Sequence, residues 1–173
     1  MYAQGRANAL ALQEKAPDMT GTELNAMDSN IPSFKAAVAN KNMLERKAGF
    51  VCRSSAGRVV RLVQPYDSTI YTQEPEELPA QWGFAWSTDP AKALPFVAMA
   101  TSPYNKGDCC TEGNKAYRST LENNVCSPSA STQGWEEVTL CRAIKFTAFR
   151  PNASTIAARL TTLLAAIPTG TVG

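Results

Sequence analysis

The sequence contains no histidine, and this absence excludes several kinds of active site. Without an imidazole the chain has no Ser-His or Cys-His nucleophile pair and no histidine base. Glycosidases can work with carboxylates alone, but the acidic pairs Glu76-Glu77 and Glu136-Glu137 are sequence neighbours. Neighbours on a strand point to opposite faces, so solvated surface charge explains them better. No P-loop or dinucleotide-binding glycine pattern occurs either. We therefore expect a protein that is not an enzyme and uses no cofactor.

Long hydrophobic runs and segregated charge are also missing. The seventeen basic and fifteen acidic residues are interspersed, which predicts no nucleic-acid partner. No segment has the length and apolar character of a membrane span. Polar residues within the first fifteen positions interrupt the apolar run that a signal peptide would need, so we expect no signal peptide. We therefore expect the chain to be synthesised in a cytoplasm. A hydrophobic content of 44% with 18% charged residues is typical of a folded chain.

Cysteine is present in an odd number without a predicted secretory signal, which argues against a disulfide framework. The five cysteines are Cys52, Cys109, Cys110, Cys126 and Cys141. Cys109 and Cys110 are adjacent, and no histidine completes a ligand set, so we predict no metal site. We expect reduced, half-buried cysteines on strands. A disulfide between Cys110 and Cys126 is the alternative for protein that has been released from a lysed cell.

The most specific pattern lies between Tyr104 and Val138. A Gly-Asp pair follows a lone tyrosine, and then come a turn with Gly113, an alternating run through Tyr117, an Asn-Asn turn, a proline and a closing Gly-Trp. This order resembles the chitin-binding type 3 carbohydrate-binding module, in the variant carried by bacteriophage and prophage structural proteins. The resemblance implies a small β-sheet module whose aromatic rings stack on sugars. Cys126 departs from the pattern because it stands where the family has an aromatic residue.

The residues of this stretch support the same interpretation without the family. Gly107 to Thr120 has the glycines and alternation of a β-hairpin. So short a strand pair needs aromatic side chains to close a core, and the same rings could serve as a platform for the apolar face of a pyranose. Both roles stay open at this point.

An earlier segment repeats the order of these markers. Gly49 precedes Cys52 by three residues, as Gly107 precedes Cys110, and a glycine turn, an arginine, a polar turn, a proline and a tryptophan follow in both segments. We infer two diverged copies of one module. In the first copy, Tyr71 takes the position of the aromatic residue that the second copy lacks.

The alternating aromatic residues Trp82, Phe84 and Trp86 would share one face of a strand. They form either a sugar-stacking strip or a seam that packs the two modules together. We favour the seam, because regularly spaced aromatics are more often core than site.

The two ends of the chain have helical patterns. In the N-terminal part, Pro17 ends a first weakly apolar helix, and Thr20 with Glu23 predicts a capping box for a second. Beyond the second module, a weak strand from Cys141 to Phe149 precedes an amphipathic helix that starts at Ser154.

These patterns predict a mainly β fold with two small tandem β-sheet modules, short N-terminal helices and a C-terminal amphipathic helix. The expected domains are a helical attachment or oligomerisation segment, a first repeat, a connector, a second repeat and a C-terminal strand plus helix, at residues 1–47, 48–89, 90–103, 104–138 and 139–173.

Two functions fit this organisation. The first is a non-catalytic bacteriophage virion protein of a tail or head fibre that attaches to bacterial surface polysaccharide, assembles in the host cytoplasm with other virion proteins and forms a homo-oligomer. The alternative is a purely structural or decoration protein whose modules no longer bind sugar. The candidate carbohydrate-binding residues are Tyr66, Tyr71, Trp82, Trp86, Tyr104, Tyr117 and Trp135.

Overall fold

We describe the protein from a computed structural model in which residues 2–139 are described. The expected strand at 141–149 and the C-terminal helix from Ser154 lie outside these residues. Within them the fold is mostly β, with two sheets and few helices, as the sequence predicts at this coarse level. No helix in residues 2–139 combines the length and the apolar character that crossing a membrane requires.

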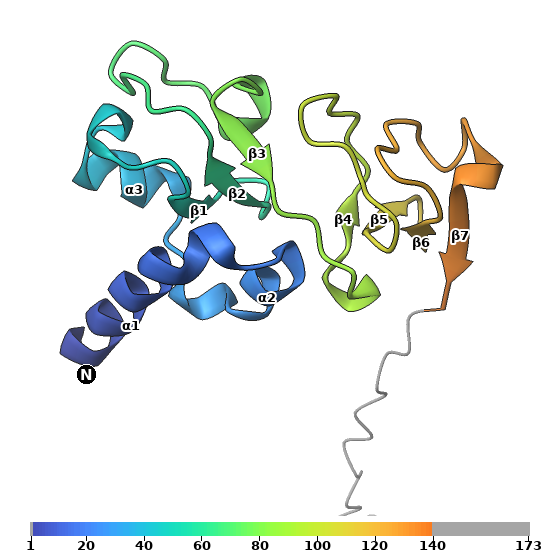
Figure 1. Ribbon diagram of the computed structural model, residues 1–173, viewed down its shortest axis with the longest axis horizontal. Helices are drawn as coiled ribbons and strands as arrows, with labels where there is room; N and C mark the ends of the chain where they lie inside the picture. The colour runs from blue at the N-terminus through green and yellow to red at the C-terminus, as the bar shows by residue number, and fades with distance from the viewer. Residues whose placement is uncertain (1, 140–173) are drawn as a thin grey trace, which may run out of the picture. The chain divides into compact units, whose positions relative to one another are not determined.

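The first sheet is a three-stranded antiparallel meander (Figure 1). Its strands are β1 (Val51–Arg53), β2 (Val59–Leu62) and β3 (Trp82–Phe84). Successive β1 residues face opposite sides of the sheet, and Val51 and Cys52 enter different hydrophobic clusters. Both faces are therefore covered, which explains why neighbouring apolar residues occur in β1 and β2 without strict alternation.

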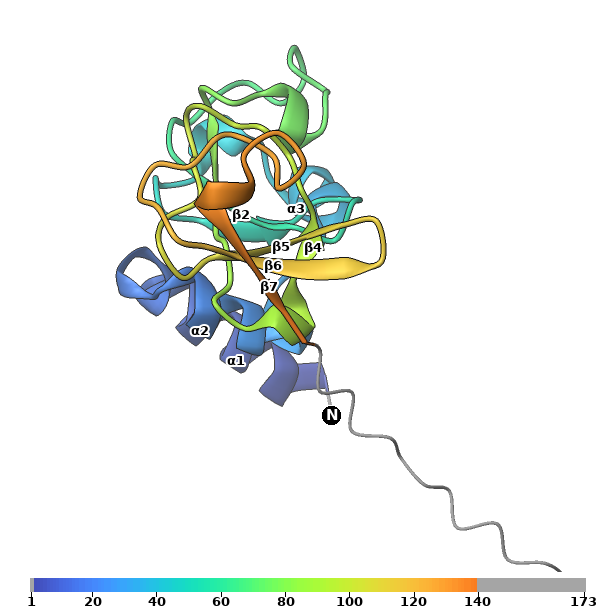
Figure 2. The same cartoon turned by 90° about the vertical axis from the view of Figure 1, so that its right-hand side faces the viewer.

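The second sheet has four strands in the order β4-β5-β6-β7 (Figure 1), and Figure 2 views it with β7 nearest the reader. They are β4 (Leu94–Pro95), β5 (Cys109–Glu112), β6 (Lys115–Ser119) and β7 (Trp135–Val138). Strand β4 runs parallel to β5, and the other pairs are antiparallel. The segment 90–103, expected as a connector, thus contributes a strand to this sheet and Phe96 to its core.

Three α-helices precede the first sheet and pack against it (Figure 1). They are α1 (Tyr2–Lys15), α2 (Gly21–Ala26) and α3 (Phe34–Asn40). The predicted capping box is present, because Thr20 Oγ1 accepts a hydrogen bond from the Glu23 N–H and the Glu23 carboxylate accepts one from the Thr20 N–H. Met27, the residue that follows the end of α2 at Ala26, is exposed.

Polar side chains attach the N-terminal helices to the first sheet. The Gln13 amide exchanges two hydrogen bonds with the backbone of Val51 at 2.8 and 2.9 Å, as a neighbouring strand would. Arg61 Nη2 donates to the carbonyls of Ala16 and Met19, just after α1. The Gln13 contact satisfies the Val51 backbone groups at the sheet edge, and Arg61 adds a donor to carbonyls just after the end of α1.

The hairpins of the two sheets have the same construction. Gly49 N–H donates to Leu62 O at 2.8 Å, and Gly107 N–H donates to Ser119 O at 2.9 Å. The glycines have φ values of +91° and +98°, which L side chains rarely adopt. Each hairpin closes through a second positive-φ glycine, at Gly57 and Gly113.

In each sheet, the strand that pairs with the second strand of the hairpin begins with a tryptophan, and this tryptophan has the same register in both sheets. Trp82 of β3 lies opposite Leu62, the last residue of β2, and Trp135 of β7 lies opposite Ser119, the last residue of β6. A phenylalanine meets each indole edge to face. Phe34 lies 5.8 Å from Trp82 at 89°, and Phe96 lies 5.9 Å from Trp135 at 90°.

Gly49 combines a left-handed backbone with a close neighbour, since a Cβ there would lie 2.7 Å from Pro17 Cγ. We therefore expect Gly49→Ala to lower the free energy of unfolding by about 2–3 kcal/mol. Gly57→Ala is the matched control: its φ is +81°, but no atom lies within 4 Å of the added Cβ. It should cost only about 1 kcal/mol of backbone strain. Urea unfolding of the full chain measures both, and equal losses would contradict the role of the Pro17 contact.

Candidate carbohydrate-binding site

Four of the seven rings predicted to bind sugar are buried in the two cores. Tyr66, Trp82, Tyr104 and Trp135 are each no more than 6% exposed. No ring face of these residues reaches solvent, so they cannot stack on a pyranose, and the expectation is corrected for all four. Short strands with few large aliphatic residues need these rings as core.

Hydrogen bonds hold both buried tryptophans in place. Trp82 Nε1 donates to the Tyr66 hydroxyl at 3.2 Å, and Trp135 Nε1 donates to Cys126 O at 2.8 Å. Burial raises the pKa of the Tyr66 hydroxyl, because the phenolate would be desolvated. A buried indole N–H without a partner would be costly, so these bonds fix the ring orientations.

Trp86 is only partly buried, but both of its ring faces are occupied. Phe84 stacks on it at 5.2 Å and Tyr104 at 4.0 Å, and its Nε1 donates to Ser102 O. The strip of alternating aromatic residues is therefore internal packing. Phe84 packs against the core of the first sheet and Trp86 against the core of the second, whereas Trp82 belongs to the core of the first sheet.

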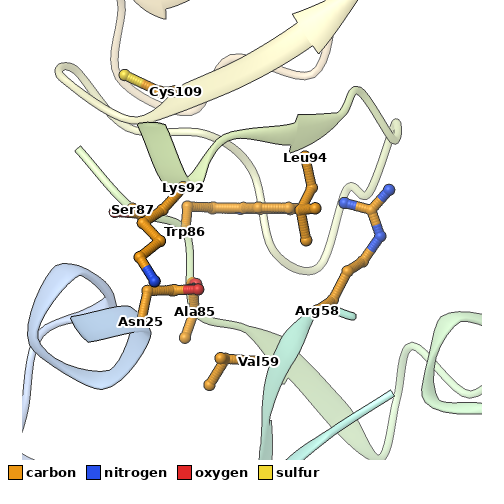
Figure 3. Close-up of a pocket in the computed structure, with 9 residues that line it drawn as sticks. All are labelled: Asn25, Arg58, Val59, Ala85, Trp86, Ser87, Lys92, Leu94 and Cys109. Atoms are coloured by element: carbon orange, nitrogen blue, oxygen red, sulfur yellow. Dashed lines mark hydrogen bonds between the residues drawn. The ribbon is translucent and has the colours of Figure 1, made fainter. Parts of the chain in front are cut away.

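A small cavity beside Trp86 is too small for a sugar (Figure 3). Its volume is about 20 Å³, close to the space that one water molecule needs. Arg58 lines it as a buried cation whose Nη2 donates to Pro95 O at 2.8 Å and whose Nε lies 3.7 Å from Glu76 Oε1. These contacts join the first sheet to strand β4 and leave no ligand-sized space.

Tyr117 projects from β6 and is partly buried against the core of the second sheet. Across the sheet it pairs with Cys110 on one side and Glu137 on the other. Its ring thus helps to cover that core.

Tyr71 is the one predicted ring with a largely accessible surface, at 48% exposure. It lies in the loop between β2 and β3, and it meets the buried Tyr66 ring edge to face at 6.4 Å. Because Tyr66 is itself bonded to Trp82, the core of the first sheet supports Tyr71 from below. This arrangement leaves part of a rigidly supported ring facing solvent.

A hydrogen-bonded turn presents Tyr71. The Tyr71 N–H donates to Asp67 O at 3.0 Å, and Asp67 Oδ1 accepts hydrogen bonds from the N–H and hydroxyl of Thr69 and from Asn42 Nδ2. These bonds lower the pKa of the Asp67 carboxyl, the Thr69 hydroxyl contributing most. Ile70, the residue before Tyr71 in the chain, is also exposed.

Asn42 and Ile70 also belong to this loop site, although no sequence pattern indicates either of them. Asn42 lies outside the expected module, yet its Oδ1 accepts hydrogen bonds from the N–H and hydroxyl of Ser68. The Asp-Ser-Thr order of residues 67–69 is a recognisable turn signal, but nothing in the sequence near Asn42 indicates its distant partner.

The corresponding loop of the second sheet, between β6 and β7, presents no aromatic ring. Its exposed apolar residues are Leu121 and Val125, and Asn124 is buried with its Nδ2 bonded to Ser119 Oγ and Gly134 O. Cys126 is an exposed free thiol off the strands, which corrects the expectation that it is a half-buried strand residue.

The other described cysteines are free and buried on strands, at Cys52, Cys109 and Cys110. Cys110 and Cys126 are not bridged in this structure. Desolvation raises the pKa of the Cys110 thiol to about 12, so it stays protonated and unreactive at neutral pH. Within residues 2–139, no group of three or more histidine, cysteine or acidic side chains is placed to hold a metal ion.

The lowered pKa of Asp67 predicts acid sensitivity of the Tyr71 loop. A carboxylate with a depressed folded-state pKa stabilises the fold above its unfolded pKa of about 3.9, and this contribution disappears as pH falls through the folded-state value. We expect Asp67→Asn to flatten the loss of stability below about pH 4. Thermal unfolding between pH 2 and 7 measures this, with the exposed Asp18→Asn as the matched loss of one carboxylate. An unchanged acid dependence in Asp67→Asn would contradict the role of the turn.

No family model, curated protein or solved structure matches the chain. We therefore infer its function from the residues and their geometry.

Proposed function

We propose that this chain is a non-catalytic bacteriophage virion protein of a tail or head fibre that attaches to bacterial surface polysaccharide. The resemblance of residues 104–138 to phage-borne carbohydrate-binding modules supports the protein class. The observation that carries the binding role is the exposed ring of Tyr71, held by Tyr66 on the loop between β2 and β3.

The two sheets are, in this proposal, tandem copies of one module. The shared hairpin register, the equivalent Gly49 and Gly107 bonds and the matching tryptophans support it. A parallel bridge also flanks each hairpin at the same place, Ser33 with Arg53 in one case and Pro95 with Thr111 in the other. The copies then begin near residues 33 and 95, earlier than the sequence boundaries at 48 and 104.

Tyr71 would bind sugar by stacking on the apolar C–H face of a pyranose. Tyr71 is 48% exposed, and polar groups of the Asp67–Thr69 turn lie near it in the chain for hydrogen bonds to hydroxyls. One such contact is weak. Several copies of the chain on one particle would raise the avidity, which is why the proposal includes a homo-oligomer assembled with other virion proteins in the host cytoplasm.

A purely structural role is the second candidate, and the burial of four predicted rings favours it. In that case the modules are spacers or decoration, and Tyr71 is an isolated surface residue. The two candidates differ in whether the folded chain retains glycan.

Retention on insoluble chitin and on peptidoglycan-containing cell walls tests the proposal. We expect the full chain to be retained and released by competing soluble oligosaccharide, and Tyr71→Ala to weaken retention by roughly threefold to tenfold. Tyr71→Phe keeps the ring and should retain most of the binding. Leu121→Ala is the matched control, because Leu121 is 50% exposed on the corresponding loop of the second sheet.

Two results would reject polysaccharide attachment through this loop. One is a folded wild-type chain that neither matrix retains, which would favour the structural role. The other is retention that Tyr71→Ala leaves unchanged while its circular dichroism matches the wild type.

Self-association is a separate expectation of the fibre proposal. Sedimentation and light scattering of the full chain should give a mass that is a multiple of 18.6 kDa. A monomer at all accessible concentrations would contradict the homo-oligomer and leave the sugar test unaffected.

A further inference from the structure

The side chains of Asp67 and Tyr71 leave the same side of one turn. The Tyr71 N–H donates to Asp67 O at 3.0 Å, which is the hydrogen bond of a single helical turn. Side chains four residues apart on such a turn are neighbours, with about 5–6 Å between their Cβ atoms. The partly exposed ring of Tyr71 therefore has a carboxylate beside it.

One oxygen of this carboxylate is accessible to a ligand. The hydrogen bonds that Asp67 accepts from Thr69 and Asn42 all end on Oδ1, and none reaches Oδ2 within residues 2–139. Asp67 is only partly buried, and Oδ2 does not belong to the buried side-chain atoms that lack a partner, so it is open to solvent. The bonds to Oδ1 hold the carboxylate in place, which makes Oδ2 a preorganised acceptor near the ring.

The charge of the loop around the ring has one sign. The loop between β2 and β3 contains no lysine or arginine, and its acidic residues are Asp67, Glu74, Glu76 and Glu77. Glu76 faces the buried Arg58 at 3.7 Å, whereas Asp67 forms no ion pair with any residue of the described part of the chain. A negative loop repels phosphate and uronate groups and attracts a cation.

The ring and the carboxylate favour the same kind of ligand. The π face of a tyrosine attracts an ammonium group, and an ionised carboxylate accepts a charge-assisted hydrogen bond from it. A pyranose with a free amine offers an ammonium to Asp67 Oδ2 and an apolar C–H face to Tyr71. An N-acetylated sugar has the face without the cation, so it lacks the second contact.

We propose that the Tyr71 loop selects polysaccharides whose hexosamine units carry a free, protonated amine. The ammonium donates a hydrogen bond to Asp67 Oδ2, and the C–H face of the same or the next pyranose lies against Tyr71. This inference rests on the proposed polysaccharide attachment and names the class of sugar that the site takes. Tyr71 then binds pyranoses in general, and Asp67 determines which of them bind best.

Three probes of matched length test the inference on the ¹⁵N-labelled full chain. They are the β-1,4-linked hexamer of glucosamine, the hexamer of N-acetylglucosamine, and hexalysine, which has the charge without the pyranose. We expect the glucosamine hexamer to shift the backbone amide signals of Asp67, Thr69 and Tyr71. It should bind roughly twofold to fivefold more tightly than the acetylated hexamer, and more tightly than hexalysine. Added salt should reduce this preference, because the charges are exposed.

The outcomes separate this inference from the proposed function. Equal affinity for the two sugars, or tighter binding of the acetylated hexamer, would overturn the inference and leave polysaccharide attachment standing. Absence of shifts with either sugar at millimolar concentration would reject the attachment itself, and the inference with it. Hexalysine that binds at the same amides as tightly as the glucosamine hexamer would overturn the sugar assignment and indicate a basic peptide as the ligand.

A charge-removing variant tests the role of Asp67. Asp67→Asn keeps an oxygen that can accept the bonds of the turn, and it should bring the affinities for the two sugars close together. Glu122→Gln is the matched control, because Glu122 is an exposed carboxylate on the corresponding loop of the second sheet and also accepts a bond from a backbone N–H. A preference that survives Asp67→Asn with a wild-type circular dichroism spectrum, or that Glu122→Gln abolishes equally, would overturn the assignment of specificity to Asp67.

Discussion

A run of four stacked rings connects the two sheets, and much of the structure depends on it. Phe84, Trp86, Tyr104 and Phe96 follow one another at centroid distances of 5.2, 4.0 and 5.4 Å. Trp135 meets two of these rings edge to face and closes the core of the second sheet. Because strands of two to five residues bury little surface by themselves, these rings supply the packing that stabilises the second sheet.

This dependence on aromatic packing limits which residues can bind a ligand. A ring that fills a core cannot also offer its face to a sugar, and Tyr104 and Trp135 are fully committed to the core. Tyr71 differs because the Tyr66 ring beneath it already closes the core of the first sheet. The binding role that we propose therefore falls to a loop residue that the core supports but does not need.

A charged group at the contact between the sheets is also needed for packing. Arg58 is buried, and its guanidinium bonds to Pro95 O and faces Glu76 and the Trp86 ring. A buried cation requires such partners to offset its desolvation. The hydrogen bond from Arg58 Nη2 to Pro95 O links the hairpin of the first sheet to strand β4.

The sequence by itself determined the features that depend on neighbouring residues. The Thr20 capping box, the end of the first helix near Pro17 and both glycine hairpins follow from side chains and backbone preferences within a few positions. The order of the markers also indicated two similar segments.

Only the tertiary structure decided which rings are buried, because alternation places Trp82 and Trp86 on one face without saying what covers it. Pairing of β4 with β5 and the reach of Asn42 to Ser68 also join residues that are far apart in sequence. Gln13 likewise holds α1 against strand β1 across 38 residues of sequence, a distance that no local pattern encodes.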